Sequence, residues 1–406
     1  MVCENDAPLV SIVGAGPAGL AAAERLAGAG FRVAVHDRMP SLARKFLMAG
    51  RGGLNLTHSE PFERLVSRYG EAGDQLQAAL AAFPPSALMD WAQGLGEETF
   101  VGTSGRVFPK SFKASPLLRA WLARLSGAGV TFHARHAWRG WDEAGRLLFD
   151  TPEGAVAEAP AATVLALGGA SWPRLGSDGA WAGLLREKGV RVTDFAPANM
   201  GIKVPWSEPY RASYAGAPLK RIALAIDGVR VRGEAMVTEE GLEGGAVYAL
   251  SKRLRRATAA GPARLIVDLR PDVEEDLLAA RFAAAPRKLS FPNLMRKAAG
   301  LAPPAAGLVR EAMGPDAPRS AEALAALVKA LPVTVTGTSG LARAISTAGG
   351  IAWPEVAADY SLRARPDTFV CGEMIDWEAP TGGYLLQACF STGRAAAEGV
   401  LARLTP

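Results

Sequence analysis

A short apolar strand that runs into a glycine turn and then a helix constrains this chain more than any other feature. Residues 10–21 (VSIVGAGPAGLA) carry the spacing Gly14-x-Gly16-x-x-Gly19 and continue into alanine-rich sequence. In this arrangement the first glycine permits a tight turn, the second lets the backbone approach a pyrophosphate, and the third lets the helix pack close to the strand. Pro17 fits the first helical turn, where its missing N–H would have been unpaired. The stretch predicts a dinucleotide-binding βαβ unit whose helix N-terminus faces the phosphates.

The next strand strengthens this prediction. Residues 31–36 (FRVAVH) are typical of a strand, and Asp37 follows the glycines at the distance of about 20 residues where an acid binds a ribose hydroxyl. The alternative is an ordinary βαβ unit in which Asp37 only caps a loop. We expect cofactor contacts from the turn and the strand end, made by Gly14, Ala15, Gly16, Pro17, Ala18, Gly19, Asp37 and Arg38.

Composition limits the class of protein. The 406 residues are 49% hydrophobic, which suits a chain of two or three domains with a large core. The formal net charge of +5 and the pI near 9.2 are mild for this length. The basic run at 252–256 (KRLRR) is interrupted by Leu254, as a solvated helical face would be, and nucleic-acid binding is the less favoured alternative. We therefore expect no nucleic-acid partner.

Cysteines, histidines and the N-terminus add further expectations. Cys3, Cys371 and Cys389 lie far apart without a CxxC pair, and the four histidines lack metal-ligand spacing, so neither a disulfide framework nor a metal site is expected. The N-terminus lacks the basic and apolar segments of a signal peptide, and no run of about 18 apolar residues occurs. We expect a cytoplasmic protein with no membrane partner.

The distribution of strand and helix signals divides the chain. Residues 1–195 alternate between the two, with one helical stretch expected at 72–95, whereas 196–271 hold strand-like runs and 272–340 are alanine- and leucine-rich with prolines that break short helices. The glycine-strand-glycine style of the first part returns at 341–406. We predict an α/β protein whose Rossmann-type nucleotide domain is built from 1–195 and 341–406 and is interrupted by a β-rich and a helical subdomain.

Two further segments carry binding chemistry. Residues 42–57 (LARKFLMAGRGGLNLT) crowd basic residues and glycines into a predicted loop, as in loops that bind anions. Residues 370–387 (VCGEMIDWEAPTGGYLLQ) are typical of a strand followed by acids and by two glycines before a helix. Glu373 or Asp376 could bind ribityl or pyrophosphate-side hydroxyls, and the helix N-terminus could stabilise negative charge on a reduced flavin. The alternative is a plain turn in which Asp376 caps a loop.

The chain resembles a family of bacterial NAD(P)/FAD-dependent flavoproteins that includes bile-acid enone reductases and aminoacetone oxidases. The matching motifs occur in order along nearly the whole chain: GAGPAG (14–19), RK (44–45) with NLT (55–57), GRVFP (105–109) with KAS (113–115), LGGASWP (167–173), TAGG (347–350), GE (372–373) with Asp376, and PTGGY (380–384) with Gln387. The resemblance implies a split FAD-binding domain, interrupted by a β-rich subdomain and a small helical subdomain that together roof the flavin.

Two segments depart from the family pattern. GRGGLN at 50–55 stands where many members have a triple-glycine, arginine, cysteine and asparagine run, and TEEGLEGG at 238–245 replaces a segment with a Thr-His pair and a Ser-Gly-Pro. The chain therefore resembles an uncharacterised branch more than the members of known activity.

The motifs and the resemblance together imply a larger site. Further FAD contacts are expected from Lys45, Asn55, Ala137, Gly168, Gly169, Gly372, Glu373, Asp376, Gly382, Gly383, Tyr384 and Gln387. Hydride transfer to or from flavin N5 depends on orientation and polarisation, because the cofactor carries the difficult step. The side chains expected near the reacting ring are Lys45, Arg51, Asn55, Arg106 and Tyr384, with Trp377 as a further stacking group. Each has a structural alternative, since the cations could only neutralise the pyrophosphate or form ion pairs, and the aromatic rings could belong to the core.

We predict an FAD-dependent oxidoreductase that acts on a small organic substrate, either as an enone-type reductase or as an amine-type oxidase. A reductase would use NADPH or NADH as a transient electron donor. Because no second GxGxxG-type domain is visible, the sequence favours the oxidase route. The alternative from another class is an FAD-binding protein with a regulatory or RNA-associated role and no small-molecule turnover.

Overall fold

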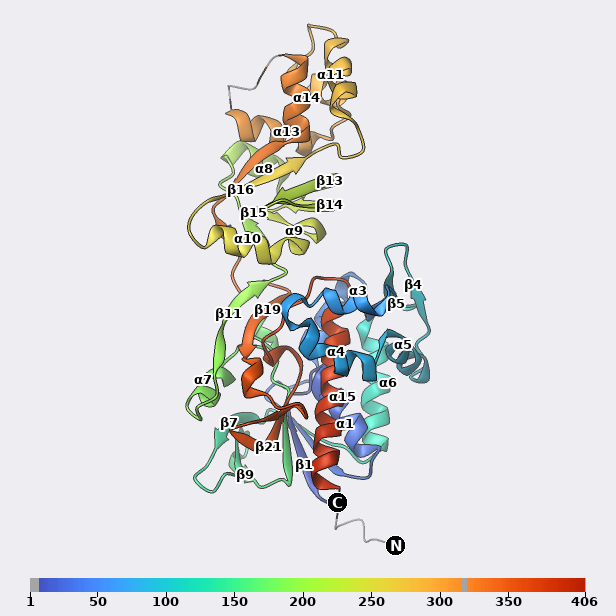
Figure 1. Cartoon of the computed structure of the whole chain (residues 1–406), viewed down its shortest axis with the longest axis vertical. Coiled ribbons are helices and arrows are strands. Elements are labelled where there is room, and N and C mark those ends of the chain that lie inside the picture. Colours follow the sequence, from blue (N-terminus) through green and yellow to red (C-terminus); the bar gives the residue numbers. More distant parts are fainter. Residues whose placement is uncertain (1–6, 315–317, 319, 406) are drawn as a thin grey trace. The chain divides into compact units, whose positions relative to one another are not determined.

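The chain folds into two compact units (Figure 1). The computed structural model describes residues 7–314, 318 and 320–405. Unit 1 consists of Met1–Ala196 together with Ser346–Pro406, and unit 2 is Pro197–Ile345. Unit 1 therefore comes from both ends of the chain, and the segments predicted at 196–271 and 272–340 lie almost entirely within unit 2.

The centre of unit 1 is a six-stranded sheet in the order β20-β21-β10-β1-β2-β6. Its strands are β1 (Leu9–Val13), β2 (Arg32–Asp37), β6 (Thr131–Ala134), β10 (Ala162–Leu165), β20 (Ser361–Leu362) and β21 (Arg365–Val370). All neighbouring strands are parallel except the edge pair β20-β21. In the centre, Val10 of β1 lies between Ala162 of β10 and Val33 of β2, and these central strands are buried and apolar. Because parallel strands end at one edge of a sheet, the turns after β1, β2, β10 and β21 meet there.

Helices flank this sheet. Those of unit 1 are α1 (Pro17–Ala27), α2 (Arg44–Ala49), α3 (Phe62–Ser67), α4 (Gly73–Ala82), α5 (Pro85–Gly94), α6 (Ala114–Gly127), α7 (Trp181–Arg186) and α15 (Tyr384–Leu404). The long α15 packs along α1 (Figure 1). A Cβ atom at Gly393 of α15 would lie 2.2 Å from the carbonyl oxygen of Ala18, so the glycine permits this close approach.

One local expectation was incomplete and another was wrong. The helical stretch predicted at 72–95 is two helices, α4 and α5, because Pro84 and Pro85 interrupt the hydrogen bonds that a continuous helix needs. The loop predicted at 42–57 contains α2, which buries Phe46. The prediction gave weight to the basic residues and glycines of this segment, although residues 44–49 (RKFLMA) are mostly good helix formers.

Three small sheets complete unit 1. One has the order β3-β5-β4, with β3 (Thr57–His58), β4 (Thr99–Val101) and β5 (Arg106–Pro109). Another has the order β7-β8-β9, with β7 (Ala137–Trp141), β8 (Leu147–Thr151) and β9 (Gly154–Glu158). The third pairs β11 (Val192–Ala198) with β19 (Ser346–Ile351), the strands on which the chain leaves and re-enters unit 1.

Unit 2 is built on a seven-stranded sheet in the order β17-β16-β13-β14-β15-β12-β18. Its strands are β12 (Ile202–Lys203), β13 (Pro218–Ile226), β14 (Val229–Val237), β15 (Gly241–Glu243), β16 (Ala263–Asp268), β17 (Leu331–Val335) and β18 (Gly337–Thr338). Its helices are α8 (Glu208–Tyr214), α9 (Gly245–Ala249), α10 (Ser251–Thr258), α11 (Glu275–Ala283), α12 (Phe291–Ala298), α13 (Pro303–Met313) and α14 (Ala321–Lys329). The sheet is antiparallel throughout.

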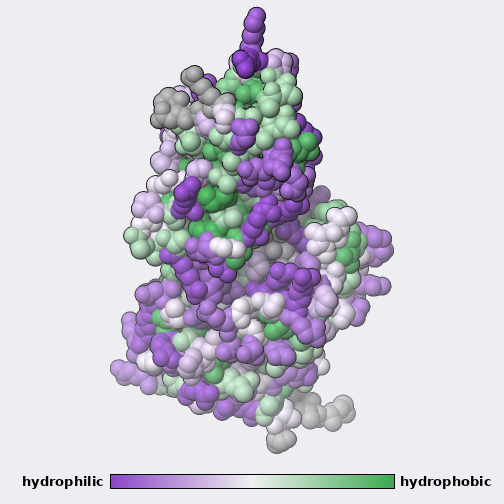
Figure 2. Space-filling view, turned by 45° about the horizontal axis from the view of Figure 1, so that its top comes forward, coloured by the Kyte–Doolittle hydropathy of each residue, from purple (hydrophilic) through white to green (hydrophobic). Residues whose placement is uncertain are grey.

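Each unit has its own hydrophobic core. Ile12, Val164 and Phe390 are buried in the core of unit 1, and Leu224 and Val267 in that of unit 2. The face seen in Figure 2 is mostly hydrophilic, with small hydrophobic patches between the hydrophilic residues. The parallel sheet with its glycine turn and covering helices confirms the predicted α/β class and its Rossmann-type domain.

Candidate functional site

A cavity of about 610 Å³ lies in unit 1 at the carboxyl ends of β1, β2, β10 and β21. Its volume is within the range of roughly 300–1,000 Å³ that is usual for cofactor sites. The predicted cofactor residues that line it are Gly14, Gly16, Pro17, Ala18, Asp37, Arg38, Lys45, Ala137, Gly168, Gly372 and Glu373. The structure thus brings together residues from both ends of the chain at the edge of the sheet where open α/β folds bind ligands.

The three glycines of the fingerprint have different surroundings. Gly14 has φ +107°, and a Cβ atom there would lie 2.3 Å from the carbonyl oxygen of Ala166. A Cβ atom at Gly19 would lie 2.0 Å from the carbonyl oxygen of Gly14, so this glycine lets α1 pack on the turn. A Cβ atom at Gly16 would meet no protein atom within 4 Å, although Gly16 lines the cavity. The space beside Gly16 therefore belongs to the cavity, as the close approach of a pyrophosphate requires.

Helix α1 begins in a form suited to an anion. Gly16 is its N-cap residue, Pro17 occupies the first turn, and no side chain caps its free N–H groups or places an acid in the first turn. These groups and the helix dipole favour negative charge at the cavity. The uncapped helix and the open space at Gly16 fit the pyrophosphate of FAD.

Asp37 holds the turn as well as lining the cavity. One carboxylate oxygen accepts the Ala15 N–H at 2.9 Å and the other accepts the Met39 N–H at 2.8 Å. Burial raises the pKa of Asp37 despite these two hydrogen bonds and the nearby Arg38 and Arg44. Each oxygen has a second lone pair, so Asp37 can cap the loop and still accept a ribose hydroxyl.

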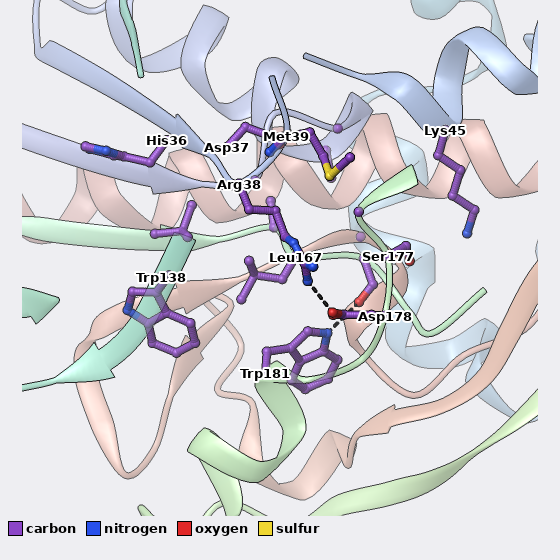
Figure 3. Close-up of a pocket in the computed structure, with 18 of the residues that line it drawn as sticks. His36, Asp37, Arg38, Met39, Lys45, Trp138, Leu167, Ser177, Asp178 and Trp181 are labelled. Atoms are coloured by element: carbon purple, nitrogen blue, oxygen red, sulfur yellow. Dashed lines mark hydrogen bonds and ion pairs between the residues drawn. The ribbon is translucent and has the colours of Figure 1, made fainter. Parts of the chain in front are cut away.

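The segment from Gly168 to Trp181 closes another side of the cavity. Arg38 forms an ion pair with Asp178, the Ser177 hydroxyl donates to the Gly169 carbonyl at 2.9 Å, and the Trp181 indole donates to the Gly168 carbonyl at 2.9 Å. Figure 3 shows the Arg38–Asp178 pair and the apolar side chains Trp138, Leu167 and Trp181 beside it. This side offers apolar surface for a planar ring next to charged groups.

Lys45 joins two parts of the site. Its ammonium group donates to Glu373 Oε2 at 2.6 Å and to Ser171 Oγ at 2.7 Å. The other oxygen of Glu373 accepts the Thr347 N–H at 2.9 Å. A Cβ atom at Gly169 would lie 2.5 Å from the Thr347 hydroxyl, so Gly169 packs against this network behind the cavity. Lys45 therefore supports the site through an ion pair while its side chain lines the cavity.

Three of the four histidines cluster beside the cavity. The His36 ring stacks on His133 and on Phe149, with centroid distances of 4.8 and 4.3 Å. The Nδ1 atoms of His36 and His136 are 3.3 Å apart, so one of them carries the proton that the other accepts. His36 Nε2 lies 3.4 Å from Glu158, which also accepts the Ser11 hydroxyl. Burial and neighbouring histidines lower the pKa of both His133 and His136.

Other predicted residues lie outside the cavity. They are Ala15, Gly19, Asn55, Arg106, Gly169, Asp376, Gly382, Gly383, Tyr384 and Gln387. Gly383 has φ +99° and is the N-cap of α15, where a Cβ atom would lie 2.5 Å from the carbonyl oxygen of Thr57. The buried Tyr384 donates to Glu60 at 2.6 Å, and the buried Gln387 accepts the Thr57 hydroxyl at 2.6 Å. Tyr384 and Gln387 are thus bound to other parts of unit 1 in this structure.

Asn55 and Arg106 retain unused polar atoms. Asn55 Oδ1 is buried without a hydrogen-bond partner. Arg106 is half-buried and forms no ion pair within residues 7–314, 318 and 320–405. A Cβ atom at Gly382 would lie 3.7 Å from Arg106 Nε, which places the guanidinium beside the turn before α15. The side chain of Arg51 lies outside the described part of the structure. Trp377 is buried and donates to the Gly372 carbonyl at 2.9 Å.

Several lining residues were missed by the sequence analysis. They include His36, Met39, Arg44, Phe46, His136, Trp138, Arg139, Leu175, Ser177, Asp178, Trp181, Cys371 and Cys389. His36 and Cys371 immediately precede predicted residues at strand ends, so their positions alone could have indicated them. Asp178 and Trp181 carry no such local signal, because they reach the cavity through the fold of the 168–181 segment.

The described residues offer neither a metal-binding cluster nor a membrane-spanning helix. No group of three histidine, cysteine, aspartate or glutamate side chains among them could hold a metal ion. No helix in residues 7–314, 318 and 320–405 has the length and apolar character needed to cross a membrane. Cys371 and Cys389 are free thiols, and Cys3 lies outside the described residues.

Comparison with known proteins gives relatives along nearly the whole chain. Residues 8–399 match the HI0933-like protein Rossmann domain. The chain is 25% identical over 418 residues to a 3-dehydro-bile acid delta(4,6)-reductase of Clostridium scindens, and the alignment covers 96% of this chain and 99% of that protein. It is 26% identical over 416 residues to a ribosomal RNA dihydrouridine synthase of Escherichia coli, with 96% and 97% covered.

Two solved structures share the fold. An open conformation of a flavocytochrome c3 fumarate reductase has a TM-score of 0.54 at 14% identity, over 99% of this chain and 79% of that one. A 3-ketosteroid delta1-dehydrogenase from Sterolibacterium denitrificans has a TM-score of 0.52 at 14% identity, over 97% and 99%. The family match spans most of the chain, and the cavity has the glycine turn and uncapped helix that the FAD pyrophosphate needs. The protein therefore belongs to the HI0933-like family of FAD-binding Rossmann proteins and is an FAD-dependent oxidoreductase.

Proposed function

We propose that this flavoenzyme reduces a carbon–carbon double bond conjugated to a carbonyl group. The observation that carries the proposal is the shared chemistry of the two relatives that align with 96% of the chain. One is named as a reductase of unsaturated 3-dehydro-bile acids, and the other as a synthase of dihydrouridine. Both names describe the addition of hydrogen to an unsaturated ring that carries a carbonyl group, which supports the enone-type branch of our prediction over the amine oxidase.

The residues around the cavity suit the holding of FAD. The N-terminus of α1 and the space beside Gly16 would take the pyrophosphate, and Asp37 would accept a ribose hydroxyl. The ion pair between Lys45 and Glu373 joins the N-terminal and C-terminal segments of unit 1 at the cavity wall. Bound FAD supplies the hydride chemistry, with NADPH or NADH as the electron source.

We assign the polarisation of the substrate to Arg106. Arg106 is a half-buried cation without an ion-pair partner among the described residues, so its N–H groups are available to a carbonyl oxygen. Asn55 has a different role, because its buried Oδ1 is an acceptor without a partner, which would hold an N–H of a bound ligand and would not polarise a carbonyl. Donors directed at an oxygen that gains negative charge stabilise the transition state of an enone reduction.

The test uses the purified holoenzyme without oxygen. NADPH is added until the flavin absorbance bleaches, and the reduced enzyme is then mixed with a 4,6-dien-3-one steroid, with cyclohexenone or with oxygen. We expect fast reoxidation by at least one enone and a product heavier by two hydrogen atoms. Reoxidation by oxygen alone, with every enone recovered unchanged, would refute the proposal and support the oxidase alternative.

A pair of arginine variants tests the assigned role. Arg106→Met should slow reoxidation by the enone without slowing the bleaching by NADPH, because the lost donors act on the substrate carbonyl. Arg119→Met is the matched control, since Arg119 is an exposed arginine on α6, whereas Arg106 is half-buried beside the turn before α15. Equal effects of the two variants would remove Arg106 from the proposed mechanism.

An RNA substrate is a second candidate. Uracil contains a carbonyl-conjugated double bond, so an RNA base and a steroid enone present the same reacting group. One relative is named for acting on ribosomal RNA. The observation in this chain that favours RNA is the charge of unit 2, which is positive while the rest of the chain is negative.

A further inference from the structure

The positive charge of the protein is concentrated in unit 2. Residues 197–345 contain 21 lysines and arginines against 14 aspartates and glutamates, a formal charge of +7, whereas the remaining residues carry −2. The small net charge of the whole chain therefore hides a strongly basic insert. A basic domain with this charge separation is typical of proteins that bind a polyanion.

The basic run at 252–256 does not account for a free binding surface. Lys252, Arg255 and Arg256 all have interaction partners, and Arg255 donates to the Pro197 carbonyl at 2.9 Å. The cations of helix α10 are therefore no basis for a free binding surface. A cluster of exposed cations lies instead on β13 and β14, two inner strands of the unit 2 sheet.

A groove with a volume of about 470 Å³ lies on β13 and β14. It is lined by Lys220, Arg221, Ile222, Arg232, Gly233, Glu234, Pro271 and Asp272, all of which belong to unit 2. Arg232 donates to Asp272 at 2.9 Å and to the Pro271 carbonyl at 2.6 Å. Arg232 thereby neutralises one of the two acids in the groove and has a fixed orientation.

A break in the strand register presents two more cations to this groove. The pairing of β13 with β14 shifts between Leu219 and Ile222, and Arg221 has φ +53°. In a regular strand, Lys220 and Arg221 would point to opposite faces of the sheet. Here both are exposed and both line the groove, while Leu219 and Ile222 on either side are buried. A β-bulge re-aims side chains in this way, and a positive φ at a non-glycine residue costs backbone energy that a functional role can explain.

Neither of these cations is used by the fold. Lys220 and Arg221 have no ion pair or hydrogen bond from their side chains within the described part of the chain. Ile222, Gly233 and Pro271 complete the lining of the groove. A flexible phosphodiester chain can adjust the positions of its phosphates to two free cations beside a fixed arginine. The lining has no exposed apolar side chains that could insert into a lipid surface.

We propose that the β13–β14 groove of unit 2 binds the phosphates of single-stranded RNA. Lys220 and Arg221 contact the phosphates, and Arg232 completes the positive side of the groove. This inference adds an RNA-binding surface to the proposed reductase, and it rests on the proposed function only in suggesting how an RNA substrate would be held. The reduction of the flavin by NADPH does not require it.

The experiment measures binding of a fluorescent single-stranded RNA oligonucleotide to the full-length holoprotein by anisotropy, at about 50 mM and about 200 mM salt. The Lys220→Ala/Arg221→Ala variant should bind about tenfold more weakly, and the slope of log affinity against log salt should decrease by about 1.4 for two lost phosphate contacts. The control is Arg287→Ala/Lys288→Ala, which removes the same charge from another exposed pair of cations in unit 2. This control should change the affinity much less.

Three outcomes would overturn the inference. They are no RNA binding by the wild type at low salt, equal weakening by both double variants, and binding of phosphatidylserine vesicles in place of RNA. Melting temperatures of both variants establish that they remain folded, and the single variant Lys220→Ala leaves the strained position intact as a second test. Bleaching of the flavin by NADPH is followed in the same preparations, so that a failure of the proposed reductase is seen separately from a failure of RNA binding.

Discussion

Substitution of Gly16 by alanine should separate cofactor binding from folding. The backbone at Gly16 has φ −76° and ψ 178°, which alanine adopts without strain, and a Cβ atom there would meet no protein atom within 4 Å. Alanine is a poorer N-cap residue than glycine by up to about 1 kcal/mol, but it also reduces the entropy of the unfolded chain by a comparable amount. The FAD-free variant should therefore melt within about 4 °C of the FAD-free wild type.

The effect on FAD should be much larger. The added methyl group occupies space that the pyrophosphate needs, and overpacking of a tight site costs about 1–3 kcal/mol. This corresponds to an affinity for FAD that is about 5- to 150-fold weaker. At an FAD concentration 100 times the wild-type Kd, ligand binding stabilises the wild type by about 2.7 kcal/mol, and a 30-fold weaker variant by about 0.9 kcal/mol.

The assay is a thermal melt of the apoprotein with increasing FAD, together with a direct titration by flavin fluorescence. Gly127→Ala is the matched control, because Gly127 ends α6 in open space and away from the cavity. Gly14→Ala should instead destabilise the fold itself, since its Cβ atom would lie 2.3 Å from the carbonyl oxygen of Ala166. Wild-type FAD affinity in Gly16→Ala would refute the assignment of the pyrophosphate to this turn.

Three further predictions concern charged groups of unit 1. Glu373→Gln should lower the melting temperature and FAD retention together, because it leaves the Lys45 ammonium without its carboxylate partner; an unchanged holoenzyme melt would contradict this. Asp37→Asn should weaken FAD binding more than it lowers the apoprotein melting temperature, because the amide keeps only one acceptor oxygen for both the loop and the ribose. Retention of FAD equal to that of the wild type would count against a ribose contact. The pKa values of His133 and His136 are lowered in the folded state, so the contribution of these residues to stability should be complete above about pH 6.5 and should decline as the pH falls below it. A melting temperature that rises on acidification over this range would contradict the expected direction.

The nucleotide-binding half of the site could be predicted from sequence because its rules are local. The turn at Gly14 needs a positive φ, and Gly19 needs space for a neighbouring carbonyl, so the residue types reveal the geometry. Asp37 was expected either to bind the ribose or to cap a loop, and the structure gives it two backbone hydrogen bonds as well as a place in the cavity wall. Both roles follow from one carboxylate at one strand end.

The rest of the site depends on tertiary structure. Trp181 and Asp178 reach the cavity through a glycine-rich segment whose path no local pattern specifies. The histidine cluster forms because β6 pairs with β2, which places His133 beside His36 although they are distant in sequence. The hydroxyl of Tyr384 is bound to Glu60, a contact between distant parts of the sequence that no local pattern indicates.

We propose that this flavoenzyme takes electrons from a nicotinamide and uses them to reduce a conjugated double bond. The most direct measurement is the visible absorption spectrum of the purified protein as NADPH, and then NADH, is added in the absence of oxygen. We predict a bound-flavin spectrum that bleaches promptly with one of the two donors. A protein that takes up no flavin on reconstitution, or a flavin that stays oxidised with both donors, would contradict the account.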